Sequence, residues 1–239
     1  GGAGLALLLL KNNIVDKLIL NDIDKSIYCF WKSILDFNKE FCEMIDIVNI
    51  DLVEREIQKK IQKDKDILDL TKKSDILKLG FSTFFLNRVN RSGIIRAGVI
   101  GGMKQNGNYK MNCRFNKNNL IERIKEIDKY KKKIEFYNLD AIDFLKKIEN
   151  KKKIFIFFDP PYFQKGKDLY TNFYMIEDHI NLAKHISNLK QDWITTYDNT
   201  EEIKEIYSEF QIKEFDILYS LEKKRKAKEI LICKKNFII

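Results

Sequence analysis

The tetrapeptide Asp159-Pro160-Pro161-Tyr162 has the residue types best suited to chemistry, and it directly follows the apolar run Ile154–Phe158. Such a run is typical of a central parallel strand covered on both faces, and ligands of open α/β sheets bind beyond the carboxyl ends of these strands. Two successive prolines fix the backbone and remove two N–H donors. The sequence therefore predicts a stiff loop that presents a carboxylate and an aromatic ring at the mouth of a cleft.

These residue types suit group transfer to the exocyclic amine of a planar base. The lone pair of that amine is delocalised, so the site must accept hydrogen bonds from its N–H groups as positive charge develops. The Asp159 carboxylate and the Pro160 carbonyl can accept them, and the ring of Tyr162, with Phe163 beside it, can replace stacking worth about 1–3 kcal/mol per base. A plain strand-ending turn is the alternative, but the preceding apolar run and the glycine-rich start of the chain favour a site.

The start of the chain, Gly1-Gly2-Ala3-Gly4, is a second candidate site because a predicted helix over residues 5–13 follows it. Glycines let a backbone approach a cofactor closely, and the N-terminus of a helix attracts polar groups. Asp22 ends a strand-like run and suits ribose hydroxyls, whereas Asp140 ends another and suits the adenine amino group of a cofactor. In this order the three features describe the nucleoside-binding edge of a sheet.

A parallel sheet with helices on its faces is expected to position these residues. Its strand-like runs alternate with helical segments and cover residues 17–22, 134–140, 154–159 and 193–197. The last two runs, residues 211–220 and 229–234, are joined by the short basic segment Glu222–Lys228, which predicts an antiparallel hairpin.

The middle of the chain has a different pattern. Residues 26–50 carry apolar side chains at a helical period and predict one helix with a buried face, and residues 51–78 predict a charged, solvated helix. Residues 80–113 hold six of the ten glycines among several arginines and lysines, which predicts loops and tight turns.

Composition excludes several classes of protein. No run approaches the roughly 20 apolar residues of a membrane span, and four scattered cysteines with only two histidines predict neither a disulfide framework nor a metal site. A soluble protein of a reducing cytoplasm is expected. The net charge of +9 favours a polyanionic partner, although the Lys, Ile and Asn bias also fits AT-rich coding.

The chain as a whole resembles the Dam-type DNA adenine methyltransferases. The segments that carry the resemblance are GGAG (1–4), LILND (18–22), FLNR (85–88) with Gly93 and Arg96, NLDAIDFL (138–145), FFDPPY (157–162) with Lys165, Gly166 and Tyr170 after it, and KKRKAKEILI (223–232).

This resemblance implies a Rossmann-like, S-adenosylmethionine-dependent methyltransferase domain that acts on adenine in double-stranded DNA. It implies that residues 1–50 and 131–239 form the catalytic domain. Residues 51–130 are then an inserted, mainly helical target-recognition region. The family's first strand precedes its glycines, so we expect further residues before Gly1. The residues implied for the cofactor are Gly1, Gly2, Gly4, Asp22, Asp140 and Asp159; those for the adenine are Asp159, Pro160, Pro161 and Tyr162; and those for DNA are Arg88, Arg91, Arg96 and Lys110.

The loop Gln164–Phe173, which contains Gly166, is expected to act as a lid.

The same residues leave other functions open. The acceptor could be cytosine N4 or an adenine in RNA, although Asp rather than Ser or Asn at position 159 favours DNA adenine by resemblance. A DNA-binding subunit that keeps the fold without activity is the rival from another class. Whether a partner restriction endonuclease exists is left open.

Overall fold

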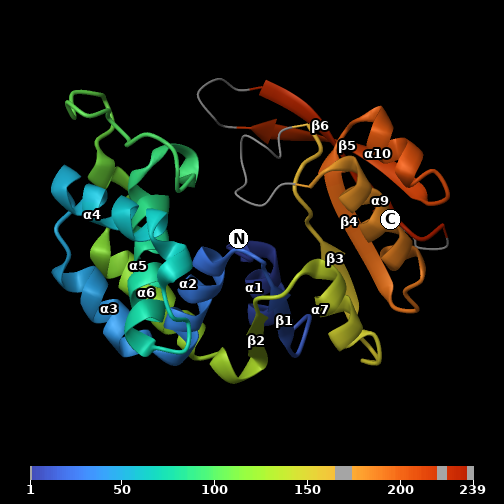
Figure 1. Cartoon of the computed structure of the whole chain (residues 1–239), viewed down its shortest axis with the longest axis horizontal. Coiled ribbons are helices and arrows are strands. Elements are labelled where there is room, and N and C mark those ends of the chain that lie inside the picture. Colours follow the sequence, from blue (N-terminus) through green and yellow to red (C-terminus); the bar gives the residue numbers. More distant parts are fainter. Residues whose placement is uncertain (1, 165–173, 220–224, 236–239) are drawn as a thin grey trace. The chain divides into compact units, whose positions relative to one another are not determined.

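The structure is a computed structural model that describes residues 2–164, 174–219 and 225–235 (Figure 1). It is a mixed α/β protein that divides into two compact units, Gly1–Leu139 and Asp140–Ile239. Within the described residues, the helices are all too short or too polar to cross a membrane.

Unit 1 combines a two-stranded parallel sheet with a helical body. Strands β1 (Leu18–Asn21) and β2 (Ile134–Tyr137) pair in register from Leu18 opposite Ile134 to Asn21 opposite Tyr137. The helices are α1 (Gly4–Lys11), α2 (Lys25–Asp36), α3 (Asn38–Ile47), α4 (Leu52–Lys63), α5 (Lys73–Val89) and α6 (Lys117–Asp128).

Aromatic side chains form much of the core of unit 1. Helix α5 packs against α2 and α4 and contributes Phe81, Phe84 and Phe85, all buried. Phe84 stacks on Phe30 of α2 with ring centroids 6.2 Å apart, and Phe85 contacts Phe115 at 5.5 Å. Aromatic pairs of this kind add about 0.5–1.5 kcal/mol each beyond the apolar area that they bury. The aromatic residues of α5 therefore belong to the core, whereas the sequence predicts a buried face only for residues 26–50.

Two predictions about the middle of the chain are wrong. The single helix expected over residues 26–50 is two helices, because Phe37 leaves the helical conformation (φ −128°, ψ 39°) and α3 begins at the next residue. The loop expected from Gly80 is helical as far as Val89. A Cβ at Gly80 would lie 2.4 Å from Ser33 Oγ and 2.5 Å from the Cys29 carbonyl oxygen. This glycine therefore permits close helix packing rather than a turn.

Unit 2 is a four-stranded mixed sheet with helices α7 (Ala141–Ile148), α9 (Ile176–Ser187) and α10 (Glu201–Ile206). The strand order is β3 (Phe155–Phe158), β4 (Asp192–Asp198), β6 (Arg225–Cys233) and β5 (Gln211–Tyr219). Strands β3 and β4 are parallel, whereas β6 runs antiparallel to both β4 and β5. The turn predicted within Glu222–Lys228 includes residues 222–224, which lie outside the described residues.

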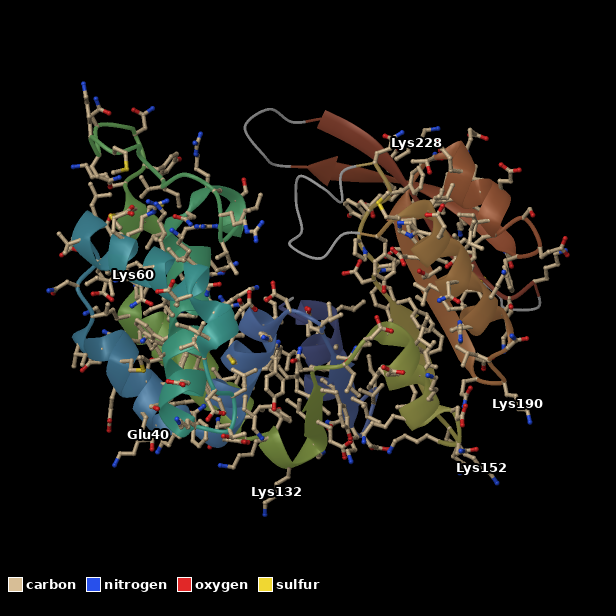
Figure 2. All side chains as sticks on the ribbon, in the orientation of Figure 1. Glu40, Lys60, Lys132, Lys152, Lys190 and Lys228 are labelled. Carbon is tan, nitrogen blue, oxygen red and sulfur yellow. The ribbon has the colours of Figure 1, made fainter. Side chains whose placement is uncertain are left out.

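The positive charge of the chain is carried on exposed side chains of both units. Lysines of several elements and loops extend from the ribbon into solvent, as Figure 2 shows for Lys60, Lys132, Lys152, Lys190 and Lys228. Charges in this setting act on partners through the long-range field rather than on the fold.

Candidate active site

Residues Asp159 to Tyr162 directly follow β3, at its carboxyl end, as the sequence predicts. The prediction of a central strand covered on both faces is wrong for the described sheet, because β3 is its edge strand and Phe155 and Phe157 are exposed. The Asp159 side chain is exposed, Pro160 is buried, and Pro161 and Tyr162 are half-buried. The Tyr162 hydroxyl donates a hydrogen bond to Glu229 Oε1 at 2.7 Å. Because the carboxylate holds the hydroxyl, the orientation of the Tyr162 ring is fixed.

The backbone after the two prolines is held by one further carboxylate. The N–H groups of Phe163 and Gln164 donate to the two oxygens of Asp198, at 2.8 and 2.9 Å. Asp198 is the last residue of β4, the strand beside β3. The loop thus has a separate anchor on each of two strands.

A buried aromatic cluster lies beside this loop. The His179 ring, wholly buried, has the rings of Phe163, Tyr174 and Tyr197 at 5.2–5.5 Å, and its Nδ1 lies 3.2 Å from the Tyr197 hydroxyl. Burial lowers the pKa of His179, raises the pKa of Tyr174 to about 12 and raises that of Tyr197 well above its usual range. These groups are neutral at physiological pH, so His179 is a structural residue of this cluster.

Asp140 lies at the start of α7, where it is exposed and caps the helix. Its Oδ1 accepts a hydrogen bond from the Ile142 N–H at 2.9 Å. An ionised carboxylate offers about four acceptor positions. Capping therefore leaves Asp140 with capacity to accept from a ligand.

In unit 1, the glycine-rich start of the chain leads directly into α1. Ala3, the N-cap residue, adopts the left-handed conformation (φ 45°) and makes no side-chain capping hydrogen bond to the first turn of the helix. A Cβ built at Gly2 or Gly4 would meet nothing within 4 Å. The segment thus combines open space with uncapped backbone N–H groups, which suits close approach of a ligand with a negatively charged group. Gly1 lies outside the described residues.

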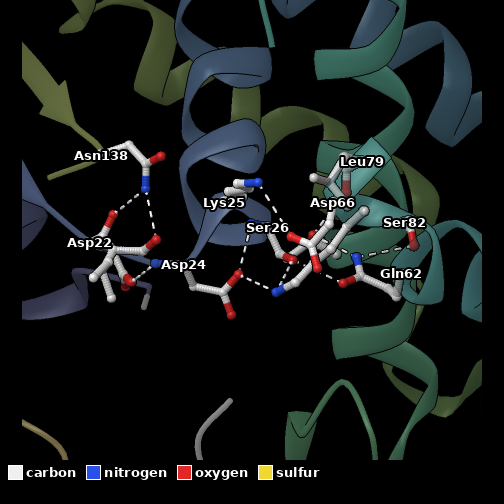
Figure 3. Close-up of polar contacts among 12 residues, drawn as sticks. Asp22, Asp24, Lys25, Ser26, Gln62, Asp66, Leu79, Ser82 and Asn138 are labelled. Atoms are coloured by element: carbon white, nitrogen blue, oxygen red, sulfur yellow. Dashed lines mark hydrogen bonds and ion pairs between the residues drawn. The ribbon is translucent and has the colours of Figure 1, made fainter. Parts of the chain in front are cut away.

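Asp22 lies just beyond β1 and is half-buried in a network of polar contacts (Figure 3). Its Oδ1 accepts from the Asp24 N–H at 3.0 Å, and Asn138, which follows β2, donates to the carbonyls of Asp22 and Ile23 at 2.9 Å each. Asn21 and Leu139 exchange two further hydrogen bonds at 3.0 Å. The carboxyl ends of the two strands are therefore tied together around Asp22.

The next carboxylate, Asp24, links this loop to the helical part of unit 1. It caps α2 through the Ser26 N–H at 2.8 Å and accepts from Lys65 Nζ at 2.9 Å (Figure 3). Burial would raise the pKa of Asp24, but the Lys65 ion pair and the Ser26 N–H together lower it below its ordinary value. Asp24 is therefore ionised and holds the loop that carries Asp22.

The expected DNA-binding residues also lie in unit 1, within and beyond the last turn of α5. Arg91, Arg96 and Lys110 are exposed. Arg88 is half-buried and donates through Nε to Asn87 Oδ1 at 3.1 Å; burial and the charges of Arg114 and Arg123 lower its pKa. Arg88 thus belongs to a crowded group of guanidiniums, whereas the other three side chains face solvent.

Two further arginines, which the sequence did not single out, shape this region. Arg55, buried on α4, donates to Asn90 Oδ1 at 2.8 Å and to the Ala97 carbonyl at 3.0 Å. Arg114 donates to the carbonyls of Asn87, Arg88 and Asn90 at 2.6–3.1 Å. The loop that carries Arg91 and Arg96 therefore has fixed ends.

The candidate residues fall into one set in each unit. Unit 1 holds Gly2, Gly4 and Asp22, and unit 2 holds Asp140 and the Asp159 loop. Residues 165–173 of the expected lid, with Lys165, Gly166 and Tyr170, lie outside the described residues. Within the described part of the chain, no three His, Cys, Asp or Glu side chains gather in a way that could hold a metal ion.

Sequence reasoning missed two carboxylates beside the Asp159 loop. Asp198 follows the strand-like run 193–197, so the strand-end rule that selects Asp22, Asp140 and Asp159 would also have selected it. Glu229 has no such signal, because its place depends on the antiparallel register that sets it opposite Asp198.

Comparison with known families gives one finding that spans both units. The model of the D12 class N6 adenine-specific DNA methyltransferases matches residues 1–221. No curated protein matches the chain. The family model confirms the resemblance to adenine methyltransferases, and with it the methyl donor S-adenosylmethionine and the acceptor, adenine N6 in DNA. The chain belongs to the D12 class N6 adenine-specific DNA methyltransferase family and is a DNA-methylating enzyme.

Proposed function

We propose that Asp159, Pro160, Pro161 and Tyr162 hold the target adenine and that Gly1, Gly2, Gly4, Asp22, Asp140 and Asp159 hold S-adenosylmethionine. The observation that carries the proposal is the loop after β3, in which an exposed carboxylate is followed by two prolines and a tyrosine whose hydroxyl is fixed by Glu229.

The residues of unit 1 fit the proposed cofactor. Gly2 and Gly4 have open space where a side chain would be, and the N-cap residue Ala3 makes no side-chain hydrogen bond to the first turn of α1, so the N–H groups of that turn can bind a carboxylate. Asp22 Oδ1 accepts a hydrogen bond from within its own loop, which fixes the carboxylate in a position to accept from ribose hydroxyls. S-adenosylmethionine supplies an electrophilic methyl group on a positively charged sulfur.

The chain's own contribution to the chemistry is positioning and charge stabilisation. The Asp159 carboxylate and the Pro160 carbonyl accept hydrogen bonds from the amine N–H groups, which keeps the nitrogen oriented while positive charge develops on it. The ring of Tyr162 offers a stacking surface for a base outside the duplex. Neither role requires a metal ion.

The remaining assignments concern the DNA and the organisation of the chain. We assign Arg88, Arg91, Arg96 and Lys110 to double-stranded DNA, because arginine and lysine bind phosphates and base edges. Residues 51–130 form the target-recognition region, and residues 1–50 and 131–239 form the catalytic domain with a Rossmann-like sheet. The four free cysteines fit a reducing cytoplasm. We also assign the enzyme to restriction-modification, in which it would act together with a partner restriction endonuclease.

Steady-state kinetics of Asp22→Ala and Asp159→Ala test one residue assigned to the cofactor alone and one assigned also to the adenine. Loss of a cofactor contact raises the KM for S-adenosylmethionine, so we expect at least a tenfold rise, ~1.4 kcal/mol, for Asp22→Ala. Loss of a contact to the reacting amine lowers kcat, by about 100-fold or more for Asp159→Ala. Asp143→Ala, an exposed residue of α7, is the control. Wild-type constants for either variant would refute that variant's assignment.

A further inference from the structure

Two carboxylates face each other across strands β4 and β6, next to the Asp159 loop. Asp198 and Glu229 are directly paired in the antiparallel register. Side chains of directly paired residues lie on the same face of a sheet, and like charges in that position are destabilising. Asp198 is half-buried and Glu229 is only 5% exposed. A buried pair of this kind needs hydrogen-bond donors, and the loop after β3 supplies them.

Three hydrogen bonds of this pair go to consecutive residues of one loop. Asp198 accepts from the N–H groups of Phe163 and Gln164, and Glu229 accepts from the Tyr162 hydroxyl. Pro160 and Pro161 have no N–H, so Tyr162 carries the first backbone donor after Asp159 and the next two donors are bound by Asp198. The two prolines therefore restrain the first part of the loop, and the two carboxylates hold the three residues that follow.

We propose that Asp198 and Glu229 are positioning residues for methyl transfer, which act through the loop and do not touch the adenine. Glu229 holds the Tyr162 hydroxyl so that only the ring is presented to the base. Asp198 holds the following backbone, which keeps Asp159 and Tyr162 at a fixed spacing. This inference rests on the proposed role of Asp159 to Tyr162.

A graded set of variants tests the role of Glu229. Glu229→Gln keeps an acceptor oxygen for the Tyr162 hydroxyl, whereas Glu229→Leu has similar size and no acceptor. Hydrogen bonds to charged groups correspond to about 10- to 100-fold in rate when they act in the transition state. We expect kcat on unmethylated plasmid DNA to fall by that amount for Glu229→Leu and by clearly less for Glu229→Gln, with the KM for S-adenosylmethionine within about threefold of wild type.

A double-mutant cycle separates positioning from a general loss of stability. Tyr162→Phe removes the hydroxyl that Glu229 holds, so Tyr162→Phe and Glu229→Leu together should lower kcat no more than the stronger single change. For Asp198, the Asn variant keeps one oxygen and the Ala variant none, so the loss of kcat should be larger for Asp198→Ala. Asp192→Ala, exposed at the other end of β4, should retain wild-type kcat. Thermal melting of every variant verifies that it is folded at the assay temperature.

The outcomes distinguish this inference from the proposed site. If Asp159→Ala is inactive while Glu229→Leu and Asp198→Ala keep kcat within about threefold of wild type, the positioning role is wrong and the site stands. The role is also wrong if the losses of Tyr162→Phe and Glu229→Leu multiply. If Glu229→Leu does not fold, the double-mutant cycle is made with Tyr162→Phe and Glu229→Gln. The positioning role is then wrong if the losses of kcat of these two variants multiply. Wild-type activity of Asp159→Ala would instead overturn the proposed site.

Discussion

Replacement of Arg55 with methionine tests whether one buried guanidinium holds the loop that follows α5. The Arg55 side chain is 4% exposed and donates to Asn90 Oδ1 at 2.8 Å and to the Ala97 carbonyl at 3.0 Å. The variant leaves both acceptors without this donor, at about 1–3 kcal/mol each. Since the desolvation of the guanidinium is relieved at the same time, we expect the free energy of unfolding to fall by about 2–4 kcal/mol.

Urea unfolding followed by circular dichroism measures this loss. The matched control is Glu56→Gln, because Arg55 Nη1 also contacts Glu56 at 3.0 Å but the Glu56 side chain is 52% exposed. Exposed pairs contribute about 0–1 kcal/mol, so the control should stay close to wild type. A loss below about 1 kcal/mol for Arg55→Met, or an equal loss for Glu56→Gln, would refute the reasoning.

Three further predictions concern packing, pH and DNA binding. Gly80→Ala should lower the melting temperature measured by calorimetry, because the new Cβ would lie 2.4 Å from Ser33 Oγ, and overpacking costs about 1–3 kcal/mol. Burial lowers the pKa of His179 in the folded protein below its ordinary value of 6.5. The unfolded chain therefore binds more protons, and the free energy of unfolding falls as the pH drops below 6.5. In urea unfolding at pH 5 and 7.5, His179→Phe should show a smaller change in this free energy than the wild type. If Arg96 contacts one phosphate, Arg96→Ala should reduce the slope of log binding constant against log salt by about 0.9, measured by fluorescence anisotropy.

The sequence predicts those elements of the fold that depend on local pattern. Asp22, Asp140 and Asp159 are the last residues of strand-like runs, and the structure has each of them just past the end of its strand or at the start of the next helix. The helix break at Phe37 has no such signal, because the apolar period continues across it from α2 into α3. Gly80 was misinterpreted for a related reason: a glycine chosen for close helix packing looks in sequence like one chosen for a turn.

The supporting side chains of the candidate site were harder to find, since their roles depend on contacts between distant segments. Arg55 resembles any charged residue of a solvated helix until the loop at Asn90 covers it. Glu229 lies 67 residues from Tyr162 in the chain, and only the register of β6 on β4 sets it beside Asp198. Residue type and spacing thus identify the groups proposed for chemistry, whereas the groups that hold them require the tertiary structure.

The most direct test of the proposed site is the product formed on unmethylated DNA by the wild-type protein and by Asp159→Ala. Both are incubated with S-adenosylmethionine carrying a labelled methyl group, beside Asp192→Ala as a matched control, and the digested nucleosides are separated. We expect labelled N6-methyladenine from the wild type and from Asp192→Ala, and a yield lower by about 100-fold or more from Asp159→Ala. N6-methyladenine at the wild-type rate from folded Asp159→Ala would contradict the proposed site.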